Sequence, residues 1–168
     1  MRKQQFKLSF LKILTEWINE QKSDERFLLL YFGEYNTLED FGIDEHDAQE
    51  TVHKIAKDNG LNILRDKELK FILIDNKMSK TIGALWTSEN SHRFSFDIVI
   101  TKKYQNKGLS DKLITAAIEE YESQKEAYGD DFKIEVDVIN PKLAQILKNK
   151  YGFHVVKEIN DGRVIMSK

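Results

Sequence analysis

The stretch that decides the fold is residues 94–118, FSFDIVITKKYQNKGLSDKLITAAI. Its first part, Phe94–Ile100, alternates apolar with polar side chains, which is typical of a strand. A polar turn with one glycine, Gln105–Ser110, follows and leads into a helical pattern that begins at about Gly108 and is broken at Gly129. Strand, turn and helix in this order present free backbone N–H groups at the positive end of a helix dipole. The pattern therefore predicts a cradle for an anionic group such as the phosphates of a cofactor.

Strand patterns lie on both sides of this stretch. Upstream, residues 69–75 and 81–87 are two further runs of strand type, and the short polar links predict an antiparallel meander that ends with residues 94–101. Downstream, we expect a strand, a short helix with Pro141 in its first turn and a final hairpin, over residues 134–139, 141–150, 153–159 and 163–167.

The first sixty residues are mostly of helical pattern. Apolar residues recur at helical spacing between Phe6 and Ile18, and a second helix fits residues 44–58, with Asp44 as its N-cap and Gly60 beyond its end. Between these helices, Phe27–Phe32 suits a buried strand. The element order predicts the α+β class, with a mixed sheet that carries helices on its faces.

Composition bounds the class of protein. The chain has 168 residues, of which 40% are hydrophobic and 32% charged, as expected for one globular domain. A net charge of −2 gives no global attraction to nucleic acid or an anionic membrane, so neither partner is expected. The absence of cysteine excludes disulfides, thiolate metal ligands and a cysteine nucleophile. No run is long enough to span a membrane, and we expect a cytoplasmic protein.

The turn at residues 105–110 resembles a motif of the GNAT superfamily of acyl-CoA-dependent N-acyltransferases. The sequence Gln-Asn-Lys-Gly-Leu-Ser matches the pattern Q/R-x-x-G-x-G/A, with Ser110 in place of the last Gly or Ala. A second motif is similar, because Asn140 leads into a short helix closed by Gly152–Phe153, although Asn140 is one residue farther from that pair than usual.

The resemblance covers residues 69–168, which would be the cofactor-binding core of a single domain over residues 1–168. Residues 1–60 would be its variable, helical acceptor side. The resemblance also implies a mostly antiparallel sheet with helices on both faces and a splay between the fourth and fifth strands.

The resemblance implies a set of cofactor contacts. The acyl-CoA pyrophosphate would accept hydrogen bonds from the backbone of the turn, and the pantetheine arm would bond to the fourth strand. Lys107 is equally well a solvated surface lysine, and Asn140, expected near the thioester, is equally well a helix N-cap. The implied cofactor-binding residues are Ile98, Val99, Ile100, Gln105, Asn106, Lys107, Gly108, Leu109, Ser110 and Asn140.

The implied reaction is direct attack of a primary amine on the thioester of acetyl-CoA within a ternary complex. It needs an oxyanion donor, for which we expect a backbone N–H near Val99 or Ile100, and a proton donor for the leaving thiolate. The family places a tyrosine four residues before the Gly-Phe pair, where this chain has Lys148, so that Lys148 is either the acid or a plain surface lysine.

Asp97, Glu135 and Asp137 are the candidate general bases, because they lie on the two strands that flank the expected splay. The plain alternative is that these carboxylates line solvent-exposed strand faces. The four histidines show no metal-binding spacing, so no metal cofactor is expected.

Two other functions compete with catalysis. The replacement of the family tyrosine by Lys148 favours a non-catalytic acyl-CoA-binding module, and the bulk of Ser110 in the turn favours a protein-interaction domain on the same fold. For the enzyme, we expect a small-molecule or peptide amine as acceptor, and a homodimer is an open alternative to a monomer.

Overall fold

The computed structural model describes residues 25–32, 38–63, 65–159 and 162–168. The helix expected between Phe6 and Ile18 lies outside the described residues, as does part of the final hairpin turn.

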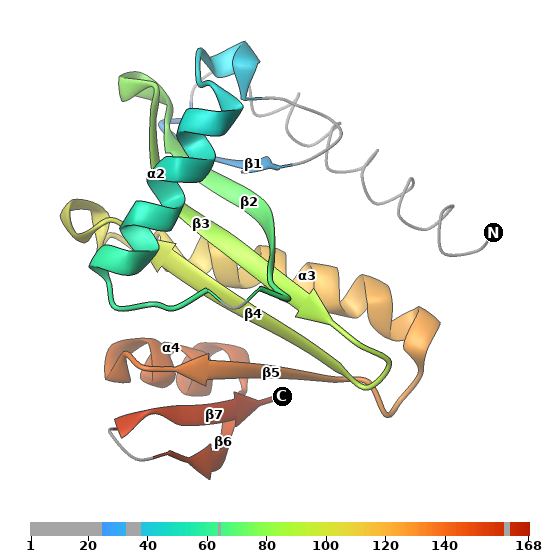
Figure 1. Ribbon diagram of the computed structural model, residues 1–168. Coiled ribbons are helices and arrows are strands. Elements are labelled where there is room, and N and C mark those ends of the chain that lie inside the picture. The colour runs from blue at the N-terminus through green and yellow to red at the C-terminus, as the bar shows by residue number, and fades with distance from the viewer. Residues whose placement is uncertain (1–24, 33–37, 64, 160–161) are drawn as a thin grey trace.

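Seven strands form one sheet in the order β1-β2-β3-β4-β5-β7-β6 (Figure 1). The expected meander is confirmed, because β2, β3 and β4 pair antiparallel in sequence, and β1 joins the free edge of β2. The strands are β1 Phe27–Tyr31, β2 Glu68–Asp75, β3 Lys80–Glu89, β4 Arg93–Ile100, β5 Lys133–Val138, β6 His154–Glu158 and β7 Val164–Ser167.

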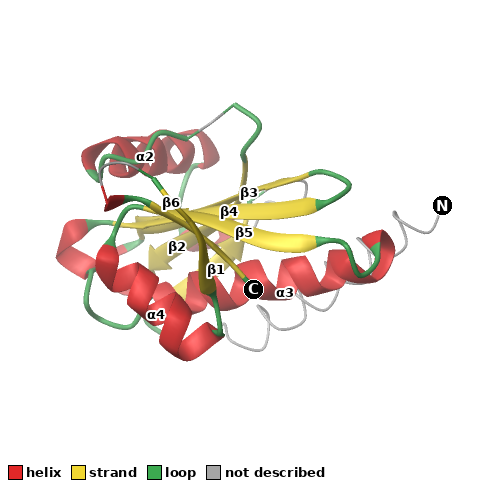
Figure 2. Ribbon diagram, turned by 90° about the horizontal axis from the view of Figure 1, so that it is seen from below, coloured by secondary structure: helices red, strands yellow, loops and turns green. Residues whose placement is uncertain are grey.

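Helices cover both faces of the sheet, as expected (Figure 2). The helix α2 (Glu45–Asp58) lies on one face, and α3 (Ser110–Tyr128) and α4 (Pro141–Tyr151) lie on the other. The predicted cap of α2 is confirmed, because the Asp44 side chain accepts a hydrogen bond from the Asp47 N–H at 3.0 Å. Three short 3₁₀ helices that the sequence pattern did not predict are η1 (Glu39–Phe41), η2 (Asn76–Met78) and η3 (Lys102–Tyr104).

The alternation along β4 feeds two separate cores. Phe94, Phe96 and Ile100 are buried with the apolar faces of α3 and α4, whereas Val99 is buried with Trp86 beneath α2. Because successive side chains of a strand point to opposite faces, the same alternation places Ser95 and Asp97 on the α2 face. Asp97 therefore lies among residues of the second core.

The strands β4 and β5 pair in parallel at one end only. Their register runs from Arg93↔Lys133 to Ser95↔Glu135, although β4 continues to Ile100 and β5 to Val138. In Figure 1 the two strands converge at this paired end and diverge toward their arrowheads. We call this divergence the splay. Its closed end is at Ser95 and its open end is at Ile100, where the chain leaves β4 for η3.

Gly83 permits the close approach of β3 and β4 beside the open end of the splay. A Cβ atom at residue 83 would lie 2.6 Å from the carbonyl oxygen of Val99, a backbone atom that cannot move away on its own. We therefore expect Gly83→Ala to lower the free energy of unfolding by about 2 kcal/mol, as measured by urea denaturation. Glu89→Ala, at the exposed end of the same strand, serves as control and should change it by less than about 0.5 kcal/mol. Equal effects of the two substitutions would contradict this explanation.

Candidate functional site

The turn between η3 and α3 presents five consecutive backbone N–H groups with no acceptor among the described residues. Toward the described residues, none of the residues 106–110 donates a backbone hydrogen bond, and the next amide, of Asp111, donates to the Gly108 carbonyl at 3.2 Å. Asn106 and Gly108 have positive φ values of 60° and 73°, which explains why the helix begins at Ser110 rather than at Gly108. No atom lies within 4 Å of a Cβ built on Gly108, so the turn is open to solvent there.

The side chain of Gln105 holds this turn against the protein. Its Nε2 atom donates to the Ile100 carbonyl at 2.8 Å and to Asn59 Oδ1 at 2.9 Å. Asn59 follows the last residue of α2, and its own side-chain amide donates to the Ile55 carbonyl at 2.8 Å. Gln105 thus joins the end of β4 to the end of α2.

A buried ionic network anchors the turn from its other side. The Tyr104 hydroxyl donates to Asp75 Oδ2 at 3.0 Å, and the Arg26 guanidinium donates to the same oxygen at 2.9 Å. Asp75 is completely buried, and hydrogen bonds from Arg26, followed by the one from Tyr104, lower its pKa against the opposing effect of burial. The Lys107 ammonium lies 5.1 Å from the centre of the Tyr104 ring. The start of the turn is therefore attached to the end of β2.

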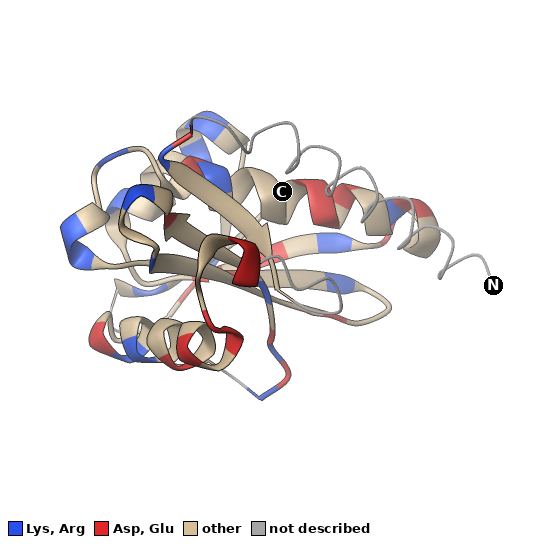
Figure 3. Ribbon diagram, turned by 90° about the horizontal axis from the view of Figure 1, so that it is seen from above, with Lys and Arg blue, Asp and Glu red and all other residues tan. Residues whose placement is uncertain are grey.

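Positive charge gathers at this end of the molecule. Lys102 and Lys103 of η3 are exposed next to the turn, and η3 is the blue helical segment at the left of Figure 3. The exposed Lys107 adds a third ammonium group. The free N–H groups, the N-terminus of α3 and these lysines together favour a bound anion.

The backbone of β4 turns alternate residues toward the splay. The Thr101 N–H donates to the Ile82 carbonyl in β3 at 2.8 Å, so the antiparallel alternation directs the backbone of Val99 to β3 as well. The closeness of the Val99 carbonyl to Gly83 agrees with this direction. The backbone groups of Ile98 and Ile100 therefore face β5. The Ile100 carbonyl accepts from Gln105, whereas the N–H of Ile100 and both backbone groups of Ile98 lie beyond the register of β4 with β5, which ends at Ser95 in the described residues.

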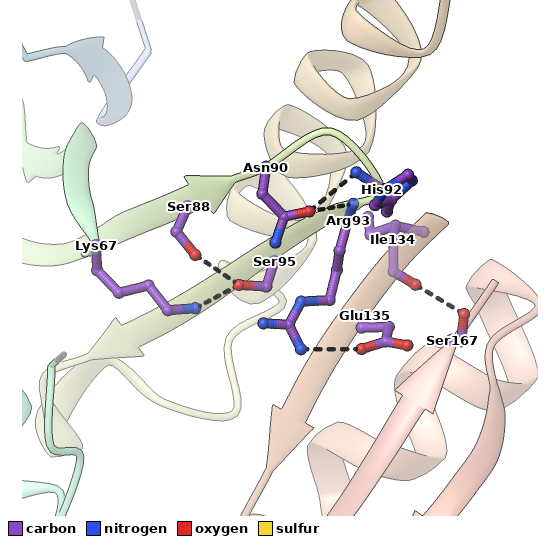
Figure 4. Close-up of polar contacts among 9 residues, drawn as sticks. All are labelled: Lys67, Ser88, Asn90, His92, Arg93, Ser95, Ile134, Glu135 and Ser167. Atoms are coloured by element: carbon purple, nitrogen blue, oxygen red, sulfur yellow. Dashed lines mark hydrogen bonds and ion pairs between the residues drawn. The ribbon is translucent and has the colours of Figure 1, made fainter. Parts of the chain in front are cut away.

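Asp97 forms a buried ion pair on the α2 face of the splay. Its Oδ2 atom lies 3.3 Å from the Nζ atom of Lys67, and the two side chains are 10% and 8% exposed. The same Nζ donates to Ser95 Oγ at 2.9 Å, and Ser88 Oγ lies 2.9 Å from Ser95 Oγ (Figure 4). Burial raises the pKa of Asp97, the Lys67 ammonium opposes this rise, and the nearby Asp137 adds to it. Asp97 is thus a carboxylate with raised affinity for a proton.

The other two candidate bases are ion-paired as well, and their side chains are more exposed than that of Asp97. Asp137 forms an ion pair with Arg163, and Glu135 accepts from Arg93 Nη1 at 3.4 Å across the closed end of the splay (Figure 4). The side chain of Arg163 is 43% exposed, and that of Arg93 is 53% exposed. Of the three carboxylates, Asp97 therefore has the environment best suited to accepting a proton.

Three polar residues at or in α4, namely Asn140, Lys148 and Tyr151, differ in their surroundings. Asn140 acts as the N-cap of α4, because its Oδ1 atom accepts from the Lys142 N–H at 2.9 Å, and its amide group remains exposed. Lys148 is exposed to solvent. The Tyr151 hydroxyl donates to Asp111 Oδ1 at 2.8 Å and so joins α4 to the first turn of α3.

The sequence pattern does not predict three of the residues that the structure brings to this site, namely Lys67, Asp75 and Tyr104. Lys67 lies in a polar segment before β2 and gives no periodic signal, and its partner Asp97 is distant in sequence. For Asp75 and Tyr104, a signal was present in part, because one carboxylate ends an otherwise apolar run and demands a partner if it is buried. In the part of the chain that the structure describes, no group of three or more acidic or histidine side chains could hold a metal ion. No described helix is long and apolar enough to cross a membrane.

Comparison with known proteins gives structural matches only. No family model and no curated protein matches the chain. An acetyltransferase of the GNAT family from Streptococcus pneumoniae matches with a TM-score of 0.53 and 17% identity, over 84% of this chain and 98% of that one. The ribosomal-protein-S18-alanine N-acetyltransferase from Escherichia coli matches with a TM-score of 0.53 and 17% identity, over 84% and 92%. An acyl-CoA N-acyltransferase from Pseudomonas aeruginosa matches with a TM-score of 0.54 and 13% identity, over 84% of this chain and 97% of that one.

The chain therefore has the fold of the GNAT superfamily. The resemblance noted in the sequence is confirmed at the level of fold, including the mostly antiparallel sheet, the splay between β4 and β5 and the helices on both faces. The parallel direction of the short β4–β5 pairing is an addition from the structure. Identities this low carry the architecture and leave the activity to be argued from the site.

The anchor at Asp75 predicts a dependence of stability on pH. Because the pKa of Asp75 is lowered from 3.8 in the folded chain, its contribution to stability is fully present above pH 3.8 and is lost as the pH falls through the folded-state value. We expect Asp75→Asn to lower the free energy of unfolding by about 2 kcal/mol at neutral pH. This difference from the unmodified chain should shrink in acid. Urea denaturation at neutral pH and near pH 3 measures it, and a difference that stays constant would refute the role of the carboxylate charge.

Proposed function

We propose that this chain is an acyl-CoA-dependent N-acyltransferase that moves an acetyl group from acetyl-CoA to a primary amine. The observation that carries the proposal is the run of five backbone N–H groups at residues 106–110, which have no acceptor in the described part of the chain and lie at the open end of the splay. A GNAT fold supports the same class of reaction by analogy.

The cofactor would lie along β4 from the open end toward the closed end. Its pyrophosphate would accept hydrogen bonds from the backbone of Asn106, Lys107, Gly108, Leu109 and Ser110, with the lysines of η3 nearby. Gln105 would act on the turn indirectly, through its bonds to Asn59 and Ile100.

The amides of the pantetheine arm would pair with the backbone of Ile98 and Ile100, as an added strand does. The exposed amide of Asn140 lies at the start of α4, which follows β5 at the same end of the sheet. It is therefore available to the pyrophosphate end of the cofactor at the mouth of the splay, rather than to the thioester, near which the resemblance places it.

The chemistry would be direct attack of a neutral amine on the thioester carbonyl carbon. Asp97 would remove a proton from the attacking ammonium, since its burial raises its affinity for protons. The N–H of Ile98 or Ile100 would stabilise the developing oxyanion, because these groups face the splay. Lys148 is the candidate donor to the leaving thiolate, and Asp137 would assist by its negative charge beside Asp97.

The acceptor would approach from the α2 face, where Asp97 lies. On this side, the C-terminal part of α2 and the loop after it border an open hollow of about 480 Å³. One of its lining residues, His53, packs edge-on against Trp86 with the ring centroids 5.8 Å apart, and Trp86 is the cross-strand partner of Asp97. We expect a small-molecule or peptide amine to enter by this route. The Escherichia coli protein of similar fold is a ribosomal-protein-S18-alanine N-acetyltransferase, whose name gives an alanine of a protein as its acceptor. The hollow is lined by His53, Ala56, Lys57, Gly60, Leu61, Asn62 and Ile63.

Gly108→Glu tests the cofactor turn. A carboxylate placed among these N–H groups would occupy the pyrophosphate site and repel the pyrophosphate. We therefore expect the thermal stabilisation by millimolar acetyl-CoA to disappear. Gly42→Glu is a matched control, because Gly42 has a similar φ of 70° and equally open surroundings, against 73° at Gly108. If both variants respond to acetyl-CoA as the unmodified chain does, the assignment of the turn is wrong.

Asp97→Asn tests the base. In a thiol-release assay with polyamine, amino acid, aminoglycoside and peptide acceptors, we expect kcat to fall by about 100-fold while the KM for acetyl-CoA stays unchanged. The variant should also lose the pH dependence of kcat/KM that the raised pKa of Asp97 produces. Asp97→Glu retains a carboxylate and should recover part of the rate. A variant with full activity would exclude Asp97 as base.

One observation favours a non-catalytic acyl-CoA-binding module as the second candidate. Lys148 occupies the position at which the resemblance implies a tyrosine acid, and its side chain is exposed. Thermal stabilisation by acetyl-CoA without thiol release with any acceptor, unchanged in Lys148→Ala, would support this module over the enzyme.

A further inference from the structure

Lys67 places a primary amine at the closed end of the splay. Its Nζ atom lies 2.9 Å from Ser95 Oγ and 3.3 Å from Asp97 Oδ2 (Figure 4 shows the first contact). Ser95 is the last residue of β4 that pairs with β5, and Asp97 is the next residue of β4 that points to the α2 face. With 8% of the side chain exposed, this amine is held inside the molecule rather than in solvent.

The direction of the proposed cofactor brings the reactive carbonyl toward this amine. The pyrophosphate site at residues 106–110 lies at the open end of the splay, and the pantetheine arm would run from it along Ile100 and Ile98 toward Ser95. The thioester is at the far end of that arm. Its carbonyl carbon would therefore lie near Asp97, on whose carboxylate the Lys67 ammonium is already positioned.

We infer that Lys67 is itself an acceptor, so that the chain acylates its own Lys67 from bound acyl-CoA. This inference rests on the proposed cofactor site and goes beyond it, because it assigns a modification site on the protein. Proximity of amine, base and thioester within one molecule makes the attack unimolecular, which is a large kinetic advantage over transfer from solution.

The reaction balances as a simple acyl transfer. Asp97 takes one proton from the Lys67 ammonium, and the lone pair of the resulting amine attacks the thioester carbonyl carbon. The carbon–sulfur bond breaks, an amide bond forms at Nζ, and the second proton lost from nitrogen leaves with the coenzyme A thiol. Asp97 then returns its proton to solvent. The product is a neutral amide, so Asp97 loses the positive partner that it has in the unmodified chain.

Lys70 provides an internal control. Its side chain is 10% exposed and is also ion-paired, with Glu68 at 2.9 Å and Glu120 at 3.9 Å. Its partner Glu120 belongs to α3, so this amine lies on the opposite face of the sheet from Lys67. Both lysines are thus buried beside a carboxylate, but only Lys67 of these two lies at the closed end of the splay. A difference in labelling between them would therefore report this position rather than burial.

The experiment uses the full chain and acetyl-CoA with an isotope-labelled acetyl group. Purified protein is incubated with the label, quenched in acid, digested and analysed by mass spectrometry, while a thermal shift with acetyl-CoA reports binding separately. We expect acetyl-Lys67 to accumulate at a first-order rate that does not depend on protein concentration. Lys67→Arg, which keeps the positive partner of Asp97, should bind acetyl-CoA and carry no label in this peptide.

Three further results bear on the inference. Lys70→Arg should leave the rate of labelling at Lys67 unchanged, Asp97→Asn should lower it by about 100-fold, and Gly108→Glu should abolish it together with binding. Binding of acetyl-CoA without acetyl-Lys67, or labelling of exposed lysines such as Lys102 as fast as Lys67, would overturn the self-acylation while leaving the cofactor site intact. Absence of any thermal shift would instead overturn the proposed function, and the inference with it.

Discussion

The separation of β4 from β5 beyond Ser95 is the constraint on which the site depends. Backbone N–H and C=O groups are obligatory hydrogen-bonding groups, and a strand that leaves its neighbour must find other partners for them. At the end of β4, one such carbonyl is satisfied by the side chain of Gln105, whereas the amides of the following turn have no acceptor in the described part of the chain. The fold thus holds a row of donors whose natural complement is an extended ligand with an anionic end.

Two long-range anchors keep that row of donors in place. On one side, Tyr104 is bound to the buried carboxylate of Asp75, and on the other, Gln105 is bound to Asn59 at the end of α2. Neither anchor uses the backbone N–H groups of residues 106–110, so the turn is attached at its start while these donors keep no acceptor among the described residues. Preorganised donors of this kind cost little reorganisation when a ligand arrives.

The elements of the sheet and the donor-rich turn at residues 105–110 followed from local patterns. Alternation gave each strand of the meander, Asp44 marked the start of α2, and Gly108 marked a turn whose positive φ only a few residue types adopt easily. The pairings that complete the site are between distant segments and leave no periodic trace. Lys67 with Asp97, and Asp75 with Tyr104, depend on which side chains the finished sheet brings together. The splay itself needed a family resemblance, because the pattern of β5 is the same whether or not it pairs along its whole length.

The hydrogen bond between Gln105 and Asn59 connects the turn at residues 106–110 to the hollow beside the end of α2, which are the two proposed ligand sites. If a ligand at the turn ordered this bond, it would also order the last residues of α2, which border the hollow at Gly60 and Leu61. The free energy of ordering would then be spent only once for two ligands, and each would raise the affinity for the other by the same factor. Under the proposed function, one side-chain amide would thus couple cofactor binding to acceptor binding.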